Sequence, residues 1–352
     1  MLTTLHAKIL LWPMTIHPPA ASTAQETRMA RPKWMRKAVA AGREFHVLHQ
    51  DRQAHNARNL ASTAGVLLGI VAVVLSASFV PATPYLLVAP WLLGMLYFSI
   101  FILVIHECSH DMFFYPADRT ATRPWNRRFG QIFSAPFFTD YVQHWEKGHL
   151  EHHLRPCEPD DPQDRDPITG WPLAARLALL MGMPGSVLVF NPSNQYGFSW
   201  KRFGFGFLGL VVPALLSSWL IAWHAGVAIL LGMHTLQILN LLKKAQEHGG
   251  GLAQAPDPLL RSRTYFYPLQ RLTSPFNIHY HFEHHANFRV PWYNLPAYHA
   301  KLRTVVPLEL QDDFFHHRYL AQAAGRFPPL DPSHIYNTSP LPRPPASAPA
   351  AR

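Results

Sequence analysis

Three short clusters of histidine stand out in this sequence because their spacing suits metal binding. Residues three or four apart lie on the same face of an α-helix, so the rings of one cluster can point toward a common ion. The H-x-x-H-H spacing occurs in two separate places, which a solvated histidine-rich loop would have no reason to repeat. The sequence therefore predicts metal ligands in HECSH (His106, His110), HLEHH (His149, His152, His153) and HYHFEHH (His281, His284, His285).

The number of histidines exceeds what a single metal ion requires. His248 lies in EHGG, just beyond the last long apolar stretch, and His144 and His279 are further candidates. A structural zinc site is complete with four ligands, so this number of imidazoles indicates two metal ions. Imidazole binds Fe, Zn, Cu and Ni, and ligand type alone does not choose among them. The apolar surroundings and the absence of a hydrolytic motif favour a redox metal that uses oxygen.

Acidic residues near the clusters are expected to support the metal-bound rings. A metal-bound imidazole usually donates its other N–H to a carboxylate or a carbonyl. Asn277, four residues before His281, could hydrogen-bond a metal-bound water, and His279 lies beside it. The candidate carboxylates are Glu107, Asp111, Glu151, Glu247, Glu283 and the acidic run after Cys157 (Glu158, Asp160, Asp161, Asp164, Asp166).

Two long stretches without charge must position these clusters. Charged residues are absent from Asn59 to His106 and again from Phe203 to Leu242. A transmembrane helix needs about 20 apolar residues, so each stretch is long enough for two crossings and a turn. The sequence predicts an all-α integral membrane protein with four transmembrane helices in two hairpins and a cytoplasmic helical cap that holds the metal site. The expected crossings are at about 61–80, 85–105, 203–221 and 227–242, with turns at 81–84 and 222–226.

The remaining segments are expected to lie outside the bilayer. Residues 1–58 read as a leader followed by a basic cytoplasmic or interfacial segment, and residues 59–327 as the membrane domain. The Pro- and Ala-rich tail at 328–352 cannot bury a core and is expected to be disordered. Residues 171–190 are apolar but too short to cross and carry Arg176, which favours an interfacial helix.

The distribution of charge predicts the orientation in the membrane. The formal net charge is +10, and Lys and Arg flank the apolar stretches. The positive-inside bias then places both termini and the metal site in the cytoplasm, and the composition favours a bacterial inner membrane. No basic helix is interleaved with stacking aromatic residues, so nucleic acid is not an expected partner. Cys108 and Cys157 are expected to be free thiols.

The three clusters, followed by VPWYNLP, resemble the membrane fatty acid desaturase and hydroxylase superfamily over roughly Arg58 to Arg303. EHGG resembles the additional histidine that this family places after its last crossing. The chain departs from the family pattern after the third cluster, where HHANFRVP replaces the frequent Phe-Pro. The resemblance implies a di-iron centre held by His106, His110, His149, His152, His153, His248, His281, His284 and His285.

The resemblance also implies an activity. It predicts an enzyme that uses O2 and external electrons to desaturate the acyl chain of a lipid or a carrier-bound fatty acid. No haem or flavin domain is visible, so the electrons are expected from a ferredoxin or similar carrier with its reductase. A hydroxylase or ketolase of a lipid or terpenoid remains an alternative because the same iron core serves all of them. A histidine-rich metal transporter is less favoured, since only His234 lies within a predicted crossing.

Overall fold

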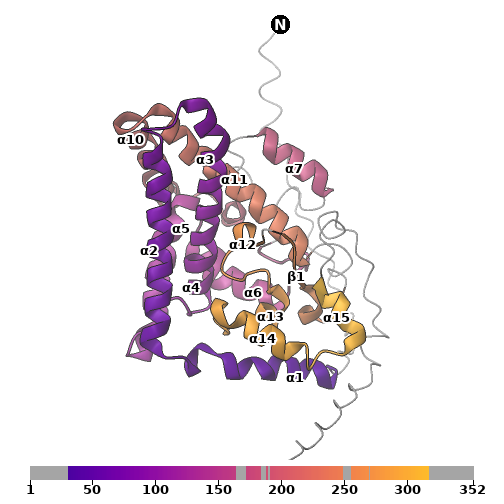
Figure 1. The fold of residues 1–352 in the computed structure, drawn as a ribbon. Coiled ribbons are helices and arrows are strands. Elements are labelled where there is room, and N and C mark those ends of the chain that lie inside the picture. Colours follow the sequence, from indigo (N-terminus) through magenta and orange to yellow (C-terminus); the bar gives the residue numbers. More distant parts are fainter. Residues whose placement is uncertain are drawn as a thin grey trace, which may run out of the picture. The chain divides into compact units, whose positions relative to one another are not determined.

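The computed structural model describes residues 31–163, 172–183, 188, 191–248, 255–268 and 270–316, and these residues are mostly helical (Figure 1). The expected leader before residue 31, the expected tail at 328–352, and Asp164 and Asp166 of the acidic run lie outside them. Two-residue strands β1 (Thr264–Tyr265) and β2 (Phe315–His316) form a parallel pair, which the sequence did not indicate.

Four helices are long and apolar enough to cross a membrane, which confirms the predicted all-α membrane fold. The second and third are continuous runs that each include a stretch of π-helix. The four are α2 (Arg52–Ser76); α3 (Ala82–Ile100) with η3 (Phe101–His106) and α4 (Glu107–Ser109); α9 (Trp200–Gly206) with η8 (Phe207–Val211) and α10 (Val212–Leu220); and α11 (Trp223–His248).

The ends of these helices differ from the expected bounds. α2 begins at Arg52, well before residue 61, because the Asp51 side chain caps it by accepting a hydrogen bond from the Ala54 N–H at 2.6 Å. α3 begins at Ala82, inside the expected turn at 81–84, and proline is tolerated in a first helical turn. α11 likewise begins at Trp223, inside the expected turn at 222–226, and continues to His248. The second and fourth helices therefore carry histidines on rigid extensions beyond their apolar spans.

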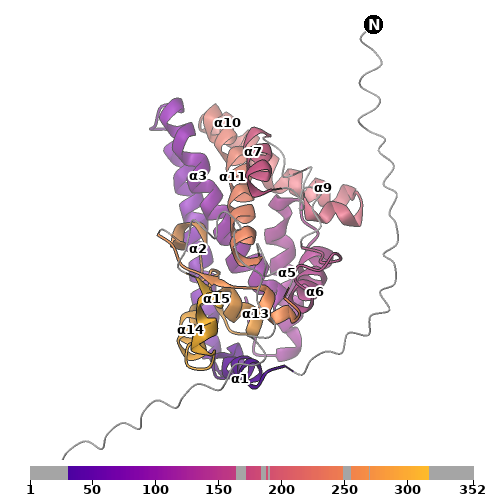
Figure 2. The ribbon, with the colours of Figure 1, turned by 90° about the vertical axis from the view of Figure 1, so that its right-hand side faces the viewer.

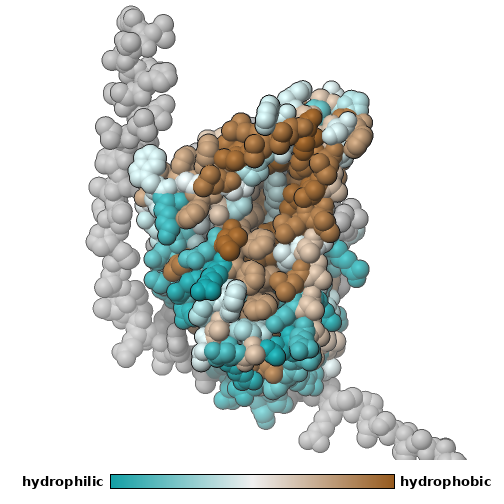
Figure 3. All heavy atoms as spheres, turned by 90° about the vertical axis from the view of Figure 1, so that its left-hand side faces the viewer, coloured by the Kyte–Doolittle hydropathy of each residue, from teal (hydrophilic) through white to brown (hydrophobic). Residues whose placement is uncertain are grey.

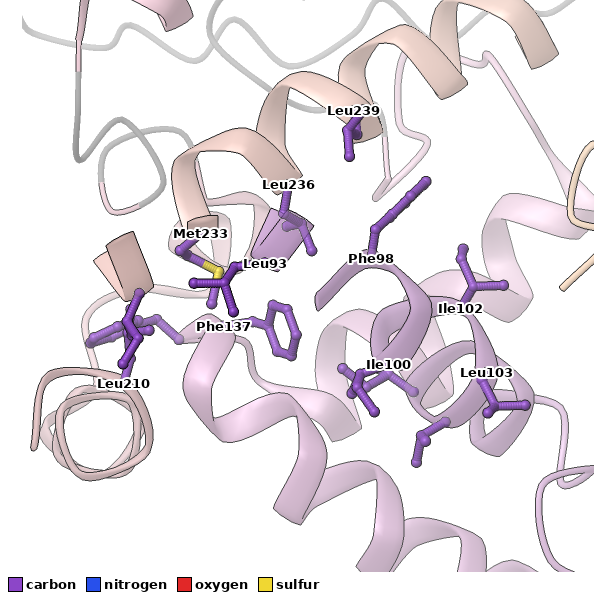
Figure 4. Packing of buried hydrophobic residues seen from close by; sticks show 14 of the residues in the cluster. Leu93, Phe98, Ile100, Ile102, Leu103, Phe137, Leu210, Met233, Leu236 and Leu239 are labelled. Atoms are coloured by element: carbon purple, nitrogen blue, oxygen red, sulfur yellow. The ribbon is translucent and has the colours of Figure 1, made fainter. Parts of the chain in front are cut away.

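Close packing of α3 on α11 forms the centre of the membrane region (Figure 4). A Cβ atom on Gly94 would lie 2.6 Å from Cβ of Thr235, and one on Gly232 would lie 2.7 Å from Cβ of Leu93. Small residues at such crossings let transmembrane helices approach each other closely. Leu93, Phe98, Met233 and Leu236 fill the space beside this crossing. α2 packs on α3, and α10 packs on α11.

The outer faces of these helices are apolar and exposed, as a lipid-facing surface requires. The hydrophobic residues gather toward one end of the face in Figure 3 and the hydrophilic residues toward the other. Trp219, Trp223 and Phe79 are exposed near the turns that join the helices of each pair. Aromatic residues at such ends are typical of the membrane–water interface.

Most of the short helices gather at the opposite end (Figure 2), whereas the helix at Leu173–Gly182 lies beside α11, nearer the turns. A second core of Trp34, Met35, Phe282, Tyr298 and Phe314 joins several of them. The α-helices are α1 (Lys33–Ala41), α5 (Thr122–Ser134), α6 (Gly148–Leu154), α7 (Leu173–Gly182), α12 (Gln270–Thr273), α13 (His281–Ala286), α14 (Leu295–Leu302) and α15 (Leu308–Phe314). The remaining turns of helix are η1 (Gly42–Phe45), η2 (Val47–His49), η4 (Arg119–Ala121), η5 (Ala135–Phe137), η6 (Tyr141–Lys147), η7 (Pro192–Tyr196), η10 (Pro258–Arg261) and η11 (Trp292–Asn294).

The structure also bears on the expected interfacial helix at 171–190 and on the two cysteines. The apolar segment at 171–190 contains helix α7 of ten residues, which is too short to cross a membrane. Its Leu180 packs against Ile238 and Leu241 of α11. Neither Cys108 nor Cys157 forms a disulfide among the residues that the structure describes, which agrees with the prediction.

A buried polar network ties the base of α2 to the segments that follow the first and third histidine clusters. The Asn59 amide donates to the Phe113 carbonyl at 2.8 Å and accepts from the Trp292 indole N–H at 2.9 Å. We expect Asn59→Leu to leave both of these buried groups unsatisfied, at a cost of about 1–3 kcal/mol each. The apparent melting temperature of the purified protein in detergent should fall clearly. Gln53→Leu, at an exposed site on the same helix, is the control, and equal melting of the two variants would contradict this role.

Candidate metal centre

Nine histidines form two adjacent groups at the ends of α3 and α11. Within each group the candidate ligand atoms lie within 4.8 Å of one another. The rings of His153 and His285, one from each group, have centroids only 4.3 Å apart. The five-histidine group contains His106, His110, His149, His153 and His284, and the four-histidine group contains His152, His248, His281 and His285. These are the nine histidines that the resemblance singled out, and His144 and His279 belong to neither group.

Each H-x-x-H-H cluster contributes to both groups. His149 and His153, four apart on α6, belong to the five-histidine group, whereas His152 belongs to the four-histidine group. On α13, His281 and His285 face the four-histidine group and His284 faces the other. One turn of helix therefore supplies candidate ligands to both groups and links them.

Irregular helix geometry directs the first two clusters inward. His106 is the last residue of π-helix η3, and His149 follows π-helix η6 by two residues. A π-helical turn inserts one extra residue and rotates the side chains beyond it, and such turns are frequent at functional sites. After His110, a left-handed Asp111 with φ of 59° ends the helix and turns the chain away.

Eight of the nine rings are buried, and His248 is half-buried. Burial holds the pKa of the His149, His153 and His284 imidazoles well below the usual value and lowers the pKa of His110 to about 3. A neutral imidazole presents a free lone pair, which is the form that binds a metal.

The Nε2 atoms converge in a way that hydrogen bonding alone cannot satisfy. His284 Nε2 lies 3.0 Å from the Nε2 atoms of both His106 and His153. His281 Nε2 lies 2.9 Å from Nε2 of His248 and 3.1 Å from Nε2 of His285. The Nε2 atom of a neutral ring offers either one N–H or one lone pair, so neither His284 nor His281 can form a full hydrogen bond with both of its neighbours. A shared cation in each group would resolve this conflict, and the residues therefore fit metal binding.

Groups behind the rings determine which nitrogen faces inward. His248 Nδ1 donates to the Arg261 carbonyl at 2.7 Å, and His152 Nδ1 donates to the Asp161 carboxylate at 2.8 Å. Because Nδ1 carries the proton in both rings, Nε2 is left as the acceptor that faces the group. Burial opposes ionisation of Asp161, but the hydrogen bond from His152 and the backbone N–H groups of Gln163 and Cys157 hold its pKa below the usual range.

Two of the acidic candidates approach a ring nitrogen at the ends of the long helices. Glu107 Oε1 is 3.4 Å from His106 Nδ1, and Glu247 Oε1 is 3.2 Å from His281 Nδ1. Asp111 is half-buried beside His110.

The other candidates lie away from the nine histidines. The Glu151 side chain is half exposed and lies 3.8 Å from Arg155. Glu283 accepts from His299 at 2.6 Å and from Thr264. Asn277 donates to the Trp292 carbonyl, and His279 contacts Gln270.

The sequence did not single out Asp161 within its acidic run and gave no signal for the Arg261 carbonyl, which any residue could supply. His299, the partner of Glu283, was likewise missed, and no spacing pattern marks it.

A polar cavity of 190 Å³ lies beside the five-histidine group. His110 lines it together with Asp111 and three arginines, Arg119, Arg123 and Arg289. Because the arginines are exposed, the cavity connects a candidate ligand with the protein surface.

Comparison with known families agrees with this geometry. The family model described as fatty acid desaturase matches residues 81–318, about two thirds of the chain, and this region contains all nine histidines. No curated protein matches the chain. The chain therefore belongs to the fatty acid desaturase family, within the membrane fatty acid desaturase and hydroxylase superfamily, and its histidine groups fit a di-iron oxidoreductase.

Proposed function

We propose that this protein is a membrane-bound, non-haem di-iron enzyme that uses O2 and external electrons to desaturate the acyl chain of a lipid or carrier-bound fatty acid. The observation that carries the proposal is the pair of adjacent groups formed by nine histidines, eight of them buried. An all-imidazole donor set suits iron, and family membership favours iron over the other metals that imidazole binds.

The chain's own residues would hold and insulate the centre. The nine histidines are the proposed ligands, while Asp161 and the Arg261 carbonyl keep the Nε2 atoms of His152 and His248 pointing inward. Bound iron would supply, with O2 and electrons, the power to remove hydrogen from an unactivated C–H bond. The packed core between α3 and α11 excludes water from the membrane side of the centre, whereas the cavity beside His110 opens to the protein surface.

The surroundings suggest where the substrate and the electrons come from. The four apolar helices beside the centre support a position next to the acyl chains of a bilayer. The positive-inside bias supports a cytoplasmic centre, and the Pro- and Ala-rich composition favours a bacterial inner membrane. A separate carrier such as a ferredoxin would supply electrons, and the exposed arginines around the cavity beside His110 complement an acidic protein.

Lipid analysis of expressing cells tests the proposal. We expect mass spectrometry to show acyl chains that have lost two hydrogens in cells with the wild-type protein, and none in cells with His153→Ala. His49→Ala is the matched control, because this exposed histidine lies outside both groups and should leave the product unchanged. A gain of one oxygen would support a hydroxylase instead. Identical lipids in all three strains would contradict the proposed function.

A further inference from the structure

The two histidine groups differ in what lies behind their rings. In the four-histidine group, Nδ1 of His152 and His248 are hydrogen-bonded to the Asp161 carboxylate and the Arg261 carbonyl. Nδ1 of His281 lies 3.2 Å from a Glu247 oxygen, although its N–H does not point along a hydrogen bond. One carboxylate and one carbonyl therefore hold two of these four rings by hydrogen bonds, and a second carboxylate lies close to a third ring.

In the five-histidine group, three of the five rings have no such hydrogen bond at Nδ1. The buried Nδ1 atoms of His149 and His153 have no hydrogen-bond partner among the residues that the structure describes. His106 Nδ1 approaches Glu107 only to 3.4 Å, without a hydrogen bond. A neutral ring without a hydrogen-bond acceptor at Nδ1 is free to carry its single proton on Nε2. That proton must leave Nε2 before the atom can bind a metal.

The carboxylates behind the four-histidine group are themselves held in place. Asp161, 1% exposed, accepts the backbone N–H groups of Cys157 and Gln163, each at 2.9 Å. Glu247 is also 1% exposed and is paired with buried Lys243 at 2.6 Å. Burying such a pair costs desolvation free energy, and the gain here is a fixed carboxylate behind His281. Lys243 also offsets the charge of Glu247, so Asp161 should have the larger effect.

From these contacts, and resting on the proposed function, we propose that the four-histidine group binds the first metal ion and that Asp161 and Glu247 are the positioning residues responsible. The five-histidine group has one more ligand, but its rings must first rearrange their protons. The four-histidine group has two rings whose Nε2 lone pairs already face inward, so less free energy is spent on binding. Mutation of a residue that hydrogen-bonds the second nitrogen of a metal-bound histidine typically changes the metal affinity by about 10–100-fold.

Anaerobic titration of the full-length apoprotein with ⁵⁷Fe(II) tests this order, with Mössbauer spectra recorded at one and two equivalents. We expect the first equivalent to give one spectral component that His285→Ala removes and His106→Ala retains. Asp161→Asn should weaken the first binding step by about 10–100-fold, and Glu247→Gln by less. Glu107→Gln, the same chemical change behind the five-histidine group, should leave the first step unchanged.

Several outcomes would overturn the proposal. In one outcome, the Mössbauer component that appears with the first equivalent of iron is lost in His106→Ala and kept in His285→Ala. In another, Asp161→Asn lowers the melting temperature of the apoprotein while the first binding constant stays at its wild-type value, which would make Asp161 merely structural. Iron binding in the proposed order without any lipid product would instead contradict only the proposed function.

Discussion

Replacing His284 by alanine is expected to reduce bound iron from two ions per chain to about one and to lower product formation by at least about 100-fold. His284 Nε2 lies 3.0 Å from the Nε2 atoms of both His106 and His153, so this ring connects the clusters from two other segments. Loss of a residue that hydrogen-bonds a metal ligand lowers metal affinity or activity by about 10–100-fold. Loss of the ligand itself should lower them by at least about 100-fold. Iron analysis of purified protein and lipid mass spectrometry measure the two effects.

His279→Ala is the matched control for this substitution. His279 belongs to the same histidine-rich segment and is 2% exposed, but it lies outside both groups and contacts Gln270. The variant should keep two iron ions per chain and substantial activity, even if it is less stable. Wild-type iron content and activity in His284→Ala would contradict the proposed assignment of ligands.

Enlarging either glycine at the crossing of α3 and α11 is expected to prevent stable folding. In Gly94→Leu the new Cβ would lie 2.6 Å from Cβ of Thr235, and in Gly232→Leu it would lie 2.7 Å from Cβ of Leu93. Both contacts are with atoms close to the partner backbone, so the helices themselves must move apart. Overpacking of a core typically costs about 1–3 kcal/mol, and a leucine at this crossing should exceed that range.

Size-exclusion profiles and melting temperatures in detergent measure this effect. Gly65→Leu on α2 is the control, because nothing lies within 4 Å of a Cβ at that position. It should behave as the wild type, whereas both crossing variants should aggregate or melt at lower temperature. They should also lose iron, since His106 ends η3, which continues α3, and His248 ends α11. Monodisperse, fully iron-loaded Gly94→Leu protein would show that the close approach is dispensable.

Several features of the centre could not be read from spacing alone. The H-x-x-H-H spacing places the histidines of each cluster on one broad face of a helix. Relative to the first histidine, however, the residue three positions later points to one side and the residue four positions later points to the other side. His152 and His153 could therefore face either group. The packing of the short helix α6 decided that His153 joins His149 and that His152 turns toward His248.

The same helical geometry explains why two acidic candidates point elsewhere. Glu151 and Glu283 occupy the same place in their clusters, two residues after the first histidine. Each residue turns a helix by about 100°, so both side chains lie roughly opposite that first histidine. Glu283 consequently pairs with His299 of α14. Sequence proximity had suggested a contact with the metal-bound rings, and helical rotation places both carboxylates away from them.

The amino-acid sequence by itself indicated the four apolar helices and the three histidine clusters, because residue type and helical spacing are local properties, and the family resemblance added His248. The tertiary structure alone decided how these histidines divide into groups of five and four. It also brought Asp161 and the Arg261 carbonyl behind His152 and His248. These contacts depend on how far π-helical turns rotate each segment and on how separate segments pack, and neither is encoded in the spacing of any one cluster.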